Sequence, residues 1–248
     1  LLTNYPPFVT TNSKSLLRHR LKESAAQCGF IACGMTPVAP VADWRQAAVR
    51  LWLDEGRAAG MSYLLRHYAL RCDPRLVEPS ARTVVSVALP YDMKPSFAPD
   101  ALRLSRYALG SDYHDVVKNR LRQMVRLLGF DPACDGRICC DTAPVDERYW
   151  AWRTGVGRWL RSGLISVRGH GTCVVLGEWL APFPMAEAEV AADTVPPLPP
   201  AEECLRCGRC LAACPGGALG GGGLDARRCL SYLSIEHRGA FPDCDEHT

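Results

Sequence analysis

The chain has 248 residues, of which 48% are hydrophobic and 22% charged, and its formal net charge is +3. This length suits one large or two modest domains, and the apolar content excludes a disordered chain. No run of about 18 apolar residues occurs, which excludes a membrane-spanning helix. The first residues also lack the basic and apolar stretches of a signal peptide. We therefore expect a cytoplasmic protein with no membrane partner.

Helical and extended patterns alternate along the first 176 residues. Apolar residues at every third or fourth position predict helices over 13–28, 41–58 and 112–128. Short apolar or β-branched runs predict strands over 30–33, 83–89, 138–140 and 172–176. This mixture predicts an α+β fold, specifically an α/β sandwich of helices packed on a sheet.

The composition changes near residue 195. Residues 190–203 contain four prolines and few large apolar groups, which is typical of a stiff, extended linker. A small segment rich in cysteine and glycine follows. We therefore predict two domains, an α/β domain over 1–194 and a small ferredoxin-like domain over 195–248.

The strongest motif lies in the second domain, where Cys204-x2-Cys207-x2-Cys210-x3-Cys214-Pro215 has the spacing of bacterial ferredoxins. Two-residue gaps allow successive sulfur atoms to reach neighbouring irons of one [4Fe–4S] cluster. A zinc site is the alternative, but zinc knuckles are usually separated by a longer insert. The predicted metal ligands are Cys204, Cys207, Cys210, Cys214 and Cys229.

The number of clusters depends on how many thiolates are available. The fourth cysteine of such a run ligates the other cluster in two-cluster ferredoxins, and two clusters take eight cysteines. From residue 204 onward the chain supplies six, with Cys229 and Cys244 following the motif. The chain either binds one cluster or lacks a downstream ligand motif, and its end at Thr248 favours an incomplete domain. We expect Asp225 to cap a helix whose first turn contains Cys229.

Other cysteines, such as Cys28, Cys33 and Cys72, are scattered through apolar surroundings and are predicted to be small buried side chains. The polar residues of the first domain are more informative. Asp141 leaves a predicted buried strand, where apolar neighbours would favour a general acid. Spacing alone, however, favours Asp141 as a cap of a helix over 142–148. His114 alone is more often a hydrogen-bonded core histidine.

Arginines are concentrated in the second half of the first domain. No acid occurs between Arg148 and Arg168, a pattern that suits contacts with phosphates, although a solvated helix face would give the same pattern. The arginines of this segment are Arg148, Arg153, Arg158, Arg161 and Arg168.

Five sequence words, in consistent order, make the chain resemble the epoxyqueuosine reductase family from about Leu16 to Gly239. They are GMSYL at 60–64, RxDPRL at 71–76, SRYAxGxDYH at 105–114, DTAPxxER at 141–148 and LDARRCxSYL at 224–233. The resemblance implies a cobalamin-dependent iron–sulfur enzyme that reduces epoxyqueuosine to queuosine at the wobble position of tRNA. It also implies a cobalamin- and substrate-binding domain over 1–194 and a domain over 195–248 that carries two [4Fe–4S] clusters in the family.

By the same resemblance, Asp141 matches the acid that protonates the leaving oxygen, and Tyr113, His114 and Arg148 match catalytic pocket positions. Arg148, Arg161 and Ser162 match positions near the cofactor. The stretch 155–162 departs from the family pattern Gly-Leu-Gly-Trp-Ile-Gly-Lys-Asn, since Leu160 replaces a glycine and Arg161 a lysine. The implied partners are the anticodon loop of tRNA and a reductant protein or small electron donor, with the chain acting as a monomer.

Two alternative functions remain open. A corrinoid-dependent reductase of a small molecule, similar to reductive dehalogenases, would use the same cofactors. Such enzymes usually have an export signal and a larger insert, and the basic segments favour tRNA instead. A non-catalytic electron carrier with a single cluster would bind no cobalamin.

Overall fold

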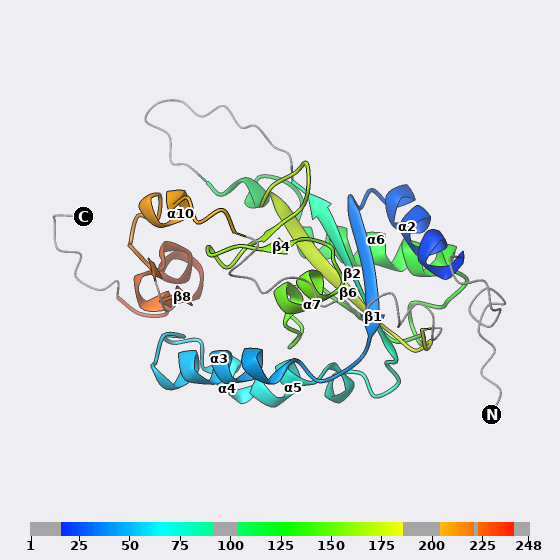
Figure 1. Ribbon diagram of the computed structural model, residues 1–248, viewed down its shortest axis with the longest axis horizontal. Coiled ribbons are helices and arrows are strands. Elements are labelled where there is room, and N and C mark those ends of the chain that lie inside the picture. The colour runs from blue at the N-terminus through cyan, green and yellow to red at the C-terminus, as the bar shows by residue number, and fades with distance from the viewer. Residues whose placement is uncertain (1–15, 92–103, 186–203, 221–222, 241–248) are drawn as a thin grey trace.

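The structure, a computed structural model, describes residues 16–91, 104–185, 204–220 and 223–240. Its centre is a four-stranded sheet with the strand order β1-β2-β6-β3, in which every pair is antiparallel (Figure 1). The strands are β1 (Ala32–Pro37), β2 (Thr83–Pro90), β3 (Arg137–Cys139) and β6 (Val174–Ala181). An antiparallel sheet with separate helices on its faces is an α+β fold, as the sequence predicts.

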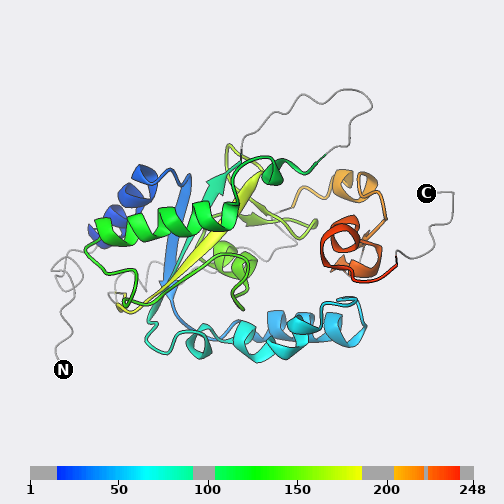
Figure 2. The ribbon, with the colours of Figure 1, turned by 180° about the vertical axis from the view of Figure 1, so that it is seen from behind.

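Helices cover both faces of the sheet. On one face lie α2 (Leu16–Gln27) and α6 (Tyr113–Leu127), and on the other lies α7 (Glu147–Arg153) (Figures 1 and 2). The central strand β2 is buried on both sides, so its residues from Thr83 to Leu89 are all buried and show no polar alternation. Its β-branched run therefore predicts a strand although the usual period of two is absent.

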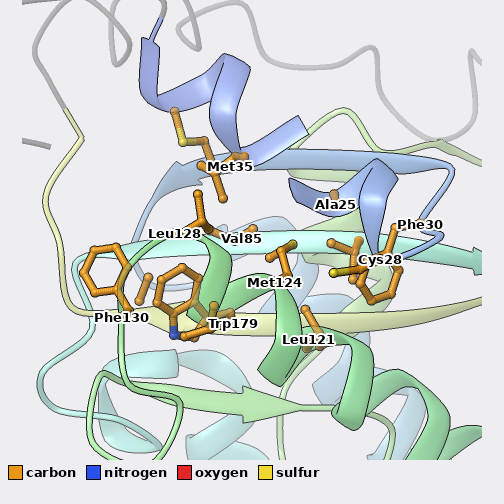
Figure 3. Packing of buried hydrophobic residues seen from close by; sticks show 14 of the residues in the cluster. Ala25, Cys28, Phe30, Met35, Val85, Leu121, Met124, Leu128, Phe130 and Trp179 are labelled. Atoms are coloured by element: carbon orange, nitrogen blue, oxygen red, sulfur yellow. The ribbon is translucent and has the colours of Figure 1, made fainter. Parts of the chain in front are cut away.

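The larger core lies between the sheet and the α2–α6 pair (Figure 3). Leu121 and Met124 of α6 meet Met35 of β1 and Trp179 of β6, and all four side chains are almost completely buried. The Trp179 indole Nε1 donates to the backbone oxygen of Asp135 over 2.8 Å, so its polar atom is satisfied. This core fixes α6, whose first residues contribute to the site described below.

On the opposite face, α7 approaches the sheet very closely at one glycine. A Cβ atom on Gly34 of β1 would lie 2.1 Å from the backbone oxygen of Thr154, the residue that ends α7. Gly34 opposes Ser86 of β2, and Ser86 in turn opposes Glu178 of β6. These residues form one row across the sheet beneath α7, with Trp150 packed in the same core.

The remaining elements are short. The segment after β1 contains α3 (Asp43–Asp54), α4 (Ser62–Arg66), α5 (Tyr68–Cys72) and a 3₁₀ turn at Pro74–Leu76. A 3₁₀ turn at Arg106–Ala108 precedes α6, and β4 (Arg158–Trp159) and β5 (Ile165–Ser166) form a hairpin after α7. The small module beyond residue 203 contains α10 (Arg209–Ala212), β7 (Leu219–Gly220), β8 (Gly223–Leu224), a 3₁₀ turn at Ala226–Arg228 and a π-helical turn at Tyr232–Glu236.

The small module contacts the α3–α4 segment (Figure 1). The backbone N–H of Ala226 donates to the backbone oxygen of Arg57 over 2.9 Å. The backbone N–H of Gly60 donates to the Tyr232 hydroxyl over 3.0 Å. These hydrogen bonds hold the cysteine-rich segment against the α+β part.

The structure differs from the sequence predictions mainly at element ends. The helix predicted at 41–58 is shorter, the strand predicted at 30–33 is displaced toward Pro37, and the strand predicted at 172–176 continues to Ala181. The predicted linker at 190–203, with the domain boundary inside it, lies outside the described residues. None of the helices described is both long and apolar enough to cross a membrane.

Candidate functional site

Asp141 occupies a tight turn directly after β3. Its φ is +56°, and the Thr142 N–H donates across it to the backbone oxygen of Cys140 over 2.6 Å. Asp is among the residues that tolerate this left-handed conformation. The Asp141 side chain is 60% exposed, so the apolar surroundings expected from the sequence lie behind the turn and not around the carboxyl group. The helix-cap interpretation of Asp141 is wrong, because α7 begins at Glu147 and is capped by Asp146.

Tyr113 and His114 form the first turn of α6 and face Asp141. The carboxylate of Asp112 caps this helix by accepting the His114 N–H over 2.9 Å, and it also lies 2.7 Å from His114 Nδ1. The other ring nitrogen, Nε2, lies 3.2 Å from Asp141 Oδ2. The Tyr113 hydroxyl is hydrogen-bonded to the same aspartate. The structure therefore brings together three of the four predicted catalytic residues.

The surroundings of His114 and Tyr113 favour the protonated form of both side chains. Partial burial alone would lower the pKa of His114, but its hydrogen bonds with Asp112 and Asp141 outweigh that effect and raise the pKa above its ordinary value. Burial, followed by the charge of Asp141, raises the pKa of Tyr113. His114 is thus a partly buried, doubly hydrogen-bonded imidazole at the edge of the site rather than a core residue. It can carry a proton between two carboxylates.

Arg148, the fourth predicted catalytic residue, lies on the first turn of α7 and is exposed. Its Nη1 lies 3.7 Å from where a Cβ on Gly163 would stand, so it approaches the tip of the β4–β5 hairpin. That tip contains the predicted cofactor residues Arg161, which is exposed, and Ser162, which is partly buried. The backbone N–H of Arg161 is hydrogen-bonded to the sulfur of Cys204. The predicted cofactor residues and the first cysteine of the motif are therefore neighbours.

The five predicted metal-ligating cysteines are all free thiols and all partly or fully exposed. The backbone N–H groups of Arg161 and Arg206 lower the pKa of Cys204, and the Ala218 N–H lies 3.2 Å from Cys214 Sγ. Hydrogen bonds of this kind stabilise thiolates and suit iron–sulfur ligands. In the described ranges no three His, Cys, Asp or Glu side chains are arranged as a metal site.

The prediction for Cys229 needs correction. Asp225 does act as a cap, but of a 3₁₀ turn at Ala226–Arg228, and Cys229 follows this turn instead of lying in the first turn of a helix. Cys244 lies outside the described residues. Of the scattered cysteines, Cys28 is buried as predicted, whereas Cys33 and Cys72 are only partly buried.

The structure adds residues that the sequence analysis did not assign to the site. Arg71 of α5 donates from Nη1 to the backbone oxygen of Val145 over 3.2 Å, just before α7. Tyr63 of α4 lies close enough to Asp141 for its charge to affect the tyrosine, and its hydroxyl donates to Glu236 of the small module over 3.3 Å. Tyr63 and Arg71 belong to the family motifs GMSYL at 60–64 and RxDPRL at 71–76, and this membership was the sequence feature that could have assigned them to the site.

These features define a class of protein: an iron–sulfur protein whose cysteine module docks beside an acid–base site on an α+β domain. Residues 71–142 match the family model described as epoxyqueuosine reductase QueG, DUF1730, and residues 203–248 match the 4Fe-4S double cluster binding domain. The epoxyqueuosine reductase of Synechococcus sp. (strain CC9605) is 36% identical over 235 residues, covering 92% of this chain and 69% of that protein. The chain belongs to the epoxyqueuosine reductase family.

Solved structures agree with this assignment. An epoxyqueuosine reductase bound to an epoxyqueuosine-modified tRNA-Tyr stem loop superimposes with a TM-score of 0.73 at 27% identity. An epoxyqueuosine reductase from Bacillus subtilis, with its catalytic aspartate loop swung out of the active site, gives 0.70 at 28% identity. The match covers 93% of this chain in both cases but only 60% of each solved chain, so the chain spans about three fifths of their length.

Proposed function

We propose that this chain reduces epoxyqueuosine to queuosine at the wobble position of tRNA, in the cytoplasm. The observation that carries the proposal is the placement of Asp141 between Tyr113 and His114, in a turn that is hydrogen-bonded to Glu147, the residue before Arg148. The reaction removes the epoxide oxygen as water. The site must therefore supply protons as well as electrons. The acid–base residues around Asp141 would supply the protons, and the cysteine-bound clusters would supply the electrons.

Asp141 acts as the proton donor to the departing oxygen. Its exposed carboxyl group is accessible to a substrate, and the Tyr113 hydroxyl and His114 Nε2 fix its orientation. His114 holds a proton against Asp141 Oδ2 and can return it after each turnover, while Asp112 Oδ1 orients the ring through Nδ1. Such a carboxylate–imidazole–carboxylate arrangement connects the donor with solvent.

The residues at the hairpin tip fit cobalamin, whose amide-rich edge needs polar partners. Arg148, Arg161 and Ser162 offer donors there, and the Arg71 Nε is buried without a partner near the same helix. When bound, cobalamin supplies the reducing electrons that open the epoxide. Cys204, Cys207, Cys210, Cys214 and Cys229 would supply five of the eight thiolates that two [4Fe–4S] clusters take, and such clusters would deliver those electrons. The match of 203–248 to a double-cluster family supports two clusters.

The anticodon loop of tRNA is the proposed partner. Exposed arginines on α7 and on the β4–β5 segment that follows it suit its phosphates. They are Arg148, Arg158, Arg161 and Arg168. The relative solved with a tRNA stem loop supports this interpretation. We propose that the chain acts as a monomer and receives electrons from a reductant protein or a small donor.

We also infer that the Asp141 turn can leave the site. The Bacillus subtilis relative has a catalytic aspartate loop in a swung-out position. Asp141 here lies in a left-handed turn and is largely exposed, so its side chain is held by hydrogen bonds with Tyr113 and His114 and not by apolar packing.

The test is replacement of Asp141 by Asn, with Asp115→Asn as the matched control. Asp115 is an exposed acid in the first turn of α6, and no role is assigned to it. With epoxyqueuosine-containing tRNA, D141N is expected to lose turnover by about a hundredfold to ten-thousandfold while keeping iron and corrinoid absorption. D115N should behave as the unmodified protein. Full turnover in D141N would refute the acid role.

Two outcomes of the same preparation would favour another function. Cluster absorption without any bound corrinoid, after anaerobic purification with added cobalamin, would favour an electron carrier. Bound corrinoid with reduction of small halogenated substrates, but not of tRNA, would favour a small-molecule reductase.

A further inference from the structure

Glu147 is the only side chain of the described residues seen to accept the backbone N–H of Asp141. It is the first residue of α7 and is partly buried, and its Oε1 takes this hydrogen bond. The contact matters because Asp141 has a positive φ, a conformation that the surrounding structure must hold in place. Glu147 therefore connects the proposed proton donor with a helix that is packed against the sheet.

A second carboxyl group stands behind Glu147. Glu178 of β6 is completely buried beneath α7, between Leu176 and Leu180, which belong to the same core. Neither of its carboxyl oxygens receives a hydrogen bond from any described donor. Its carboxyl group faces that of Glu147, within hydrogen-bonding distance. Two carboxylates cannot hydrogen-bond to each other, so one of them must carry a proton.

The surrounding charges decide which of the two carboxyl groups, Glu147 or Glu178, is ionised. The charged or titratable groups that interact with the pair are Arg71, Cys139, Cys140, Asp141, Asp146 and Arg148. The two arginines act on Glu147 and stabilise its anion, whereas Glu178 has no cation beside it among the described residues. Burial raises the pKa of Glu147 to about 7 and raises the pKa of Glu178 well above its ordinary value. The shared proton therefore resides on Glu178, which donates to Glu147.

We propose that Glu147 is a positioning residue that holds the Asp141 turn in the site, and that protonated Glu178 holds Glu147 in place. In this arrangement the hydrogen bonds run from the Glu178 carboxyl to Glu147, and from the Asp141 N–H to Glu147. Release of the Asp141 N–H would free the turn to swing outward. The expected effect of these two hydrogen bonds on turnover rests on the proposed function, but the hydrogen bonds themselves do not.

The test measures amide hydrogen exchange at Asp141 by mass spectrometry, in the cluster-containing protein without substrate. In E147A the acceptor is lost, and we expect Asp141 to exchange at least tenfold faster. In E147Q the amide oxygen still accepts, and protection should remain close to that of the unmodified protein. E178Q, which retains a donor, should also keep protection, whereas E178L, which is apolar, should lose it. Amides of β2 report global unfolding and should be unchanged in all four variants.

Equal Asp141 exchange in E147A and the unmodified protein would overturn the proposal. So would loss of protection in E147Q or E178Q while β2 stays protected, because hydrogen bonding would then not be the cause. If E147A proves globally unstable, with faster exchange in β2 as well, the comparison of E178L with E178Q decides. In turnover assays, E147A should lower kcat at least tenfold with little change in KM for tRNA, and E147Q should restore kcat. Failure of turnover in the unmodified protein would refute the proposed function and leave the exchange result standing.

Discussion

Replacement of Gly34 by alanine tests whether α7 is seated on the sheet as the structure shows. The new Cβ would stand 2.1 Å from the backbone oxygen of Thr154, where an ordinary carbon–oxygen contact needs more than about 3 Å. A backbone oxygen cannot rotate away as a flexible side chain can. The end of α7 must therefore move outward by about 1 Å, although its own residues Trp150 and Ala151 are buried in the core.

Two opposing terms set the magnitude. Overpacking of a close contact usually costs about 1–3 kcal/mol, and backbone involvement places Gly34→Ala near the upper end. The φ of Gly34 is not positive, so alanine also restricts the unfolded chain and gains about 0.4–1 kcal/mol. We expect a net loss of about 2 kcal/mol in the free energy of unfolding.

Gly110→Ala is the matched control. Nothing lies within 4 Å of the position that a Cβ on Gly110 would take, and the φ of Gly110 is not positive, so only the favourable term applies. Anaerobic urea titration followed by far-ultraviolet circular dichroism should rank G110A at or slightly above the unmodified protein and G34A below it. A G34A protein as stable as G110A would show that α7 does not rest on β1, and the reasoning would fail.

Two further predictions concern the site. Asp112→Asn removes a carboxylate that raises the pKa of His114, so the His114 resonance in a proton NMR titration should titrate at lower pH, while D115N leaves it unchanged. The raised pKa stabilises the fold while His114 is charged, and this contribution is lost as the pH rises and the imidazole deprotonates. In D112N the loss should therefore be complete at a lower pH than in the unmodified protein. Cys207→Ala should reduce the iron bound per chain by the content of one cluster, whereas alanine at the exposed Cys134 should leave iron unchanged, and equal iron in both variants would contradict the ligand assignment.

The fold could be predicted where local pattern and tertiary structure agree. The helix at 112–128 and the strand at 83–89 were found because one has a long amphipathic period and the other a β-branched run. The helices α4, α5 and α7 have only five, five and seven residues, and a helical period cannot be recognised over so short a span. Their positions depend on packing that no local pattern contains.

The site was predictable only in part from residue chemistry. Spacing could not decide whether Asp141 or Asp146 caps α7, because both precede the same helix within the motif at 141–148. The resemblance matched Asp141 to the proton donor. The structure shows that Asp146 is the cap, because α7 begins at Glu147. Glu178 left a signal that was not used, since it is the single acid in the otherwise apolar strand Val174–Ala181. A lone acid in a buried strand needs a partner, and the partner could not be identified without the fold.

The way the small module docks also bears on how electrons and protons reach one place. Tyr232 and Glu236 of the module contact Gly60 and Tyr63, and Tyr63 lies within electrostatic reach of Asp141. A shift of the module would therefore move a side chain of the acid site as well as the cysteines. On the other side, the Arg161 N–H ties the hairpin tip to Cys204. Because both connections consist of individual hydrogen bonds between short segments, the relative position of the electron-delivering and proton-delivering residues depends on module docking, and not on the rigidity of the sheet alone.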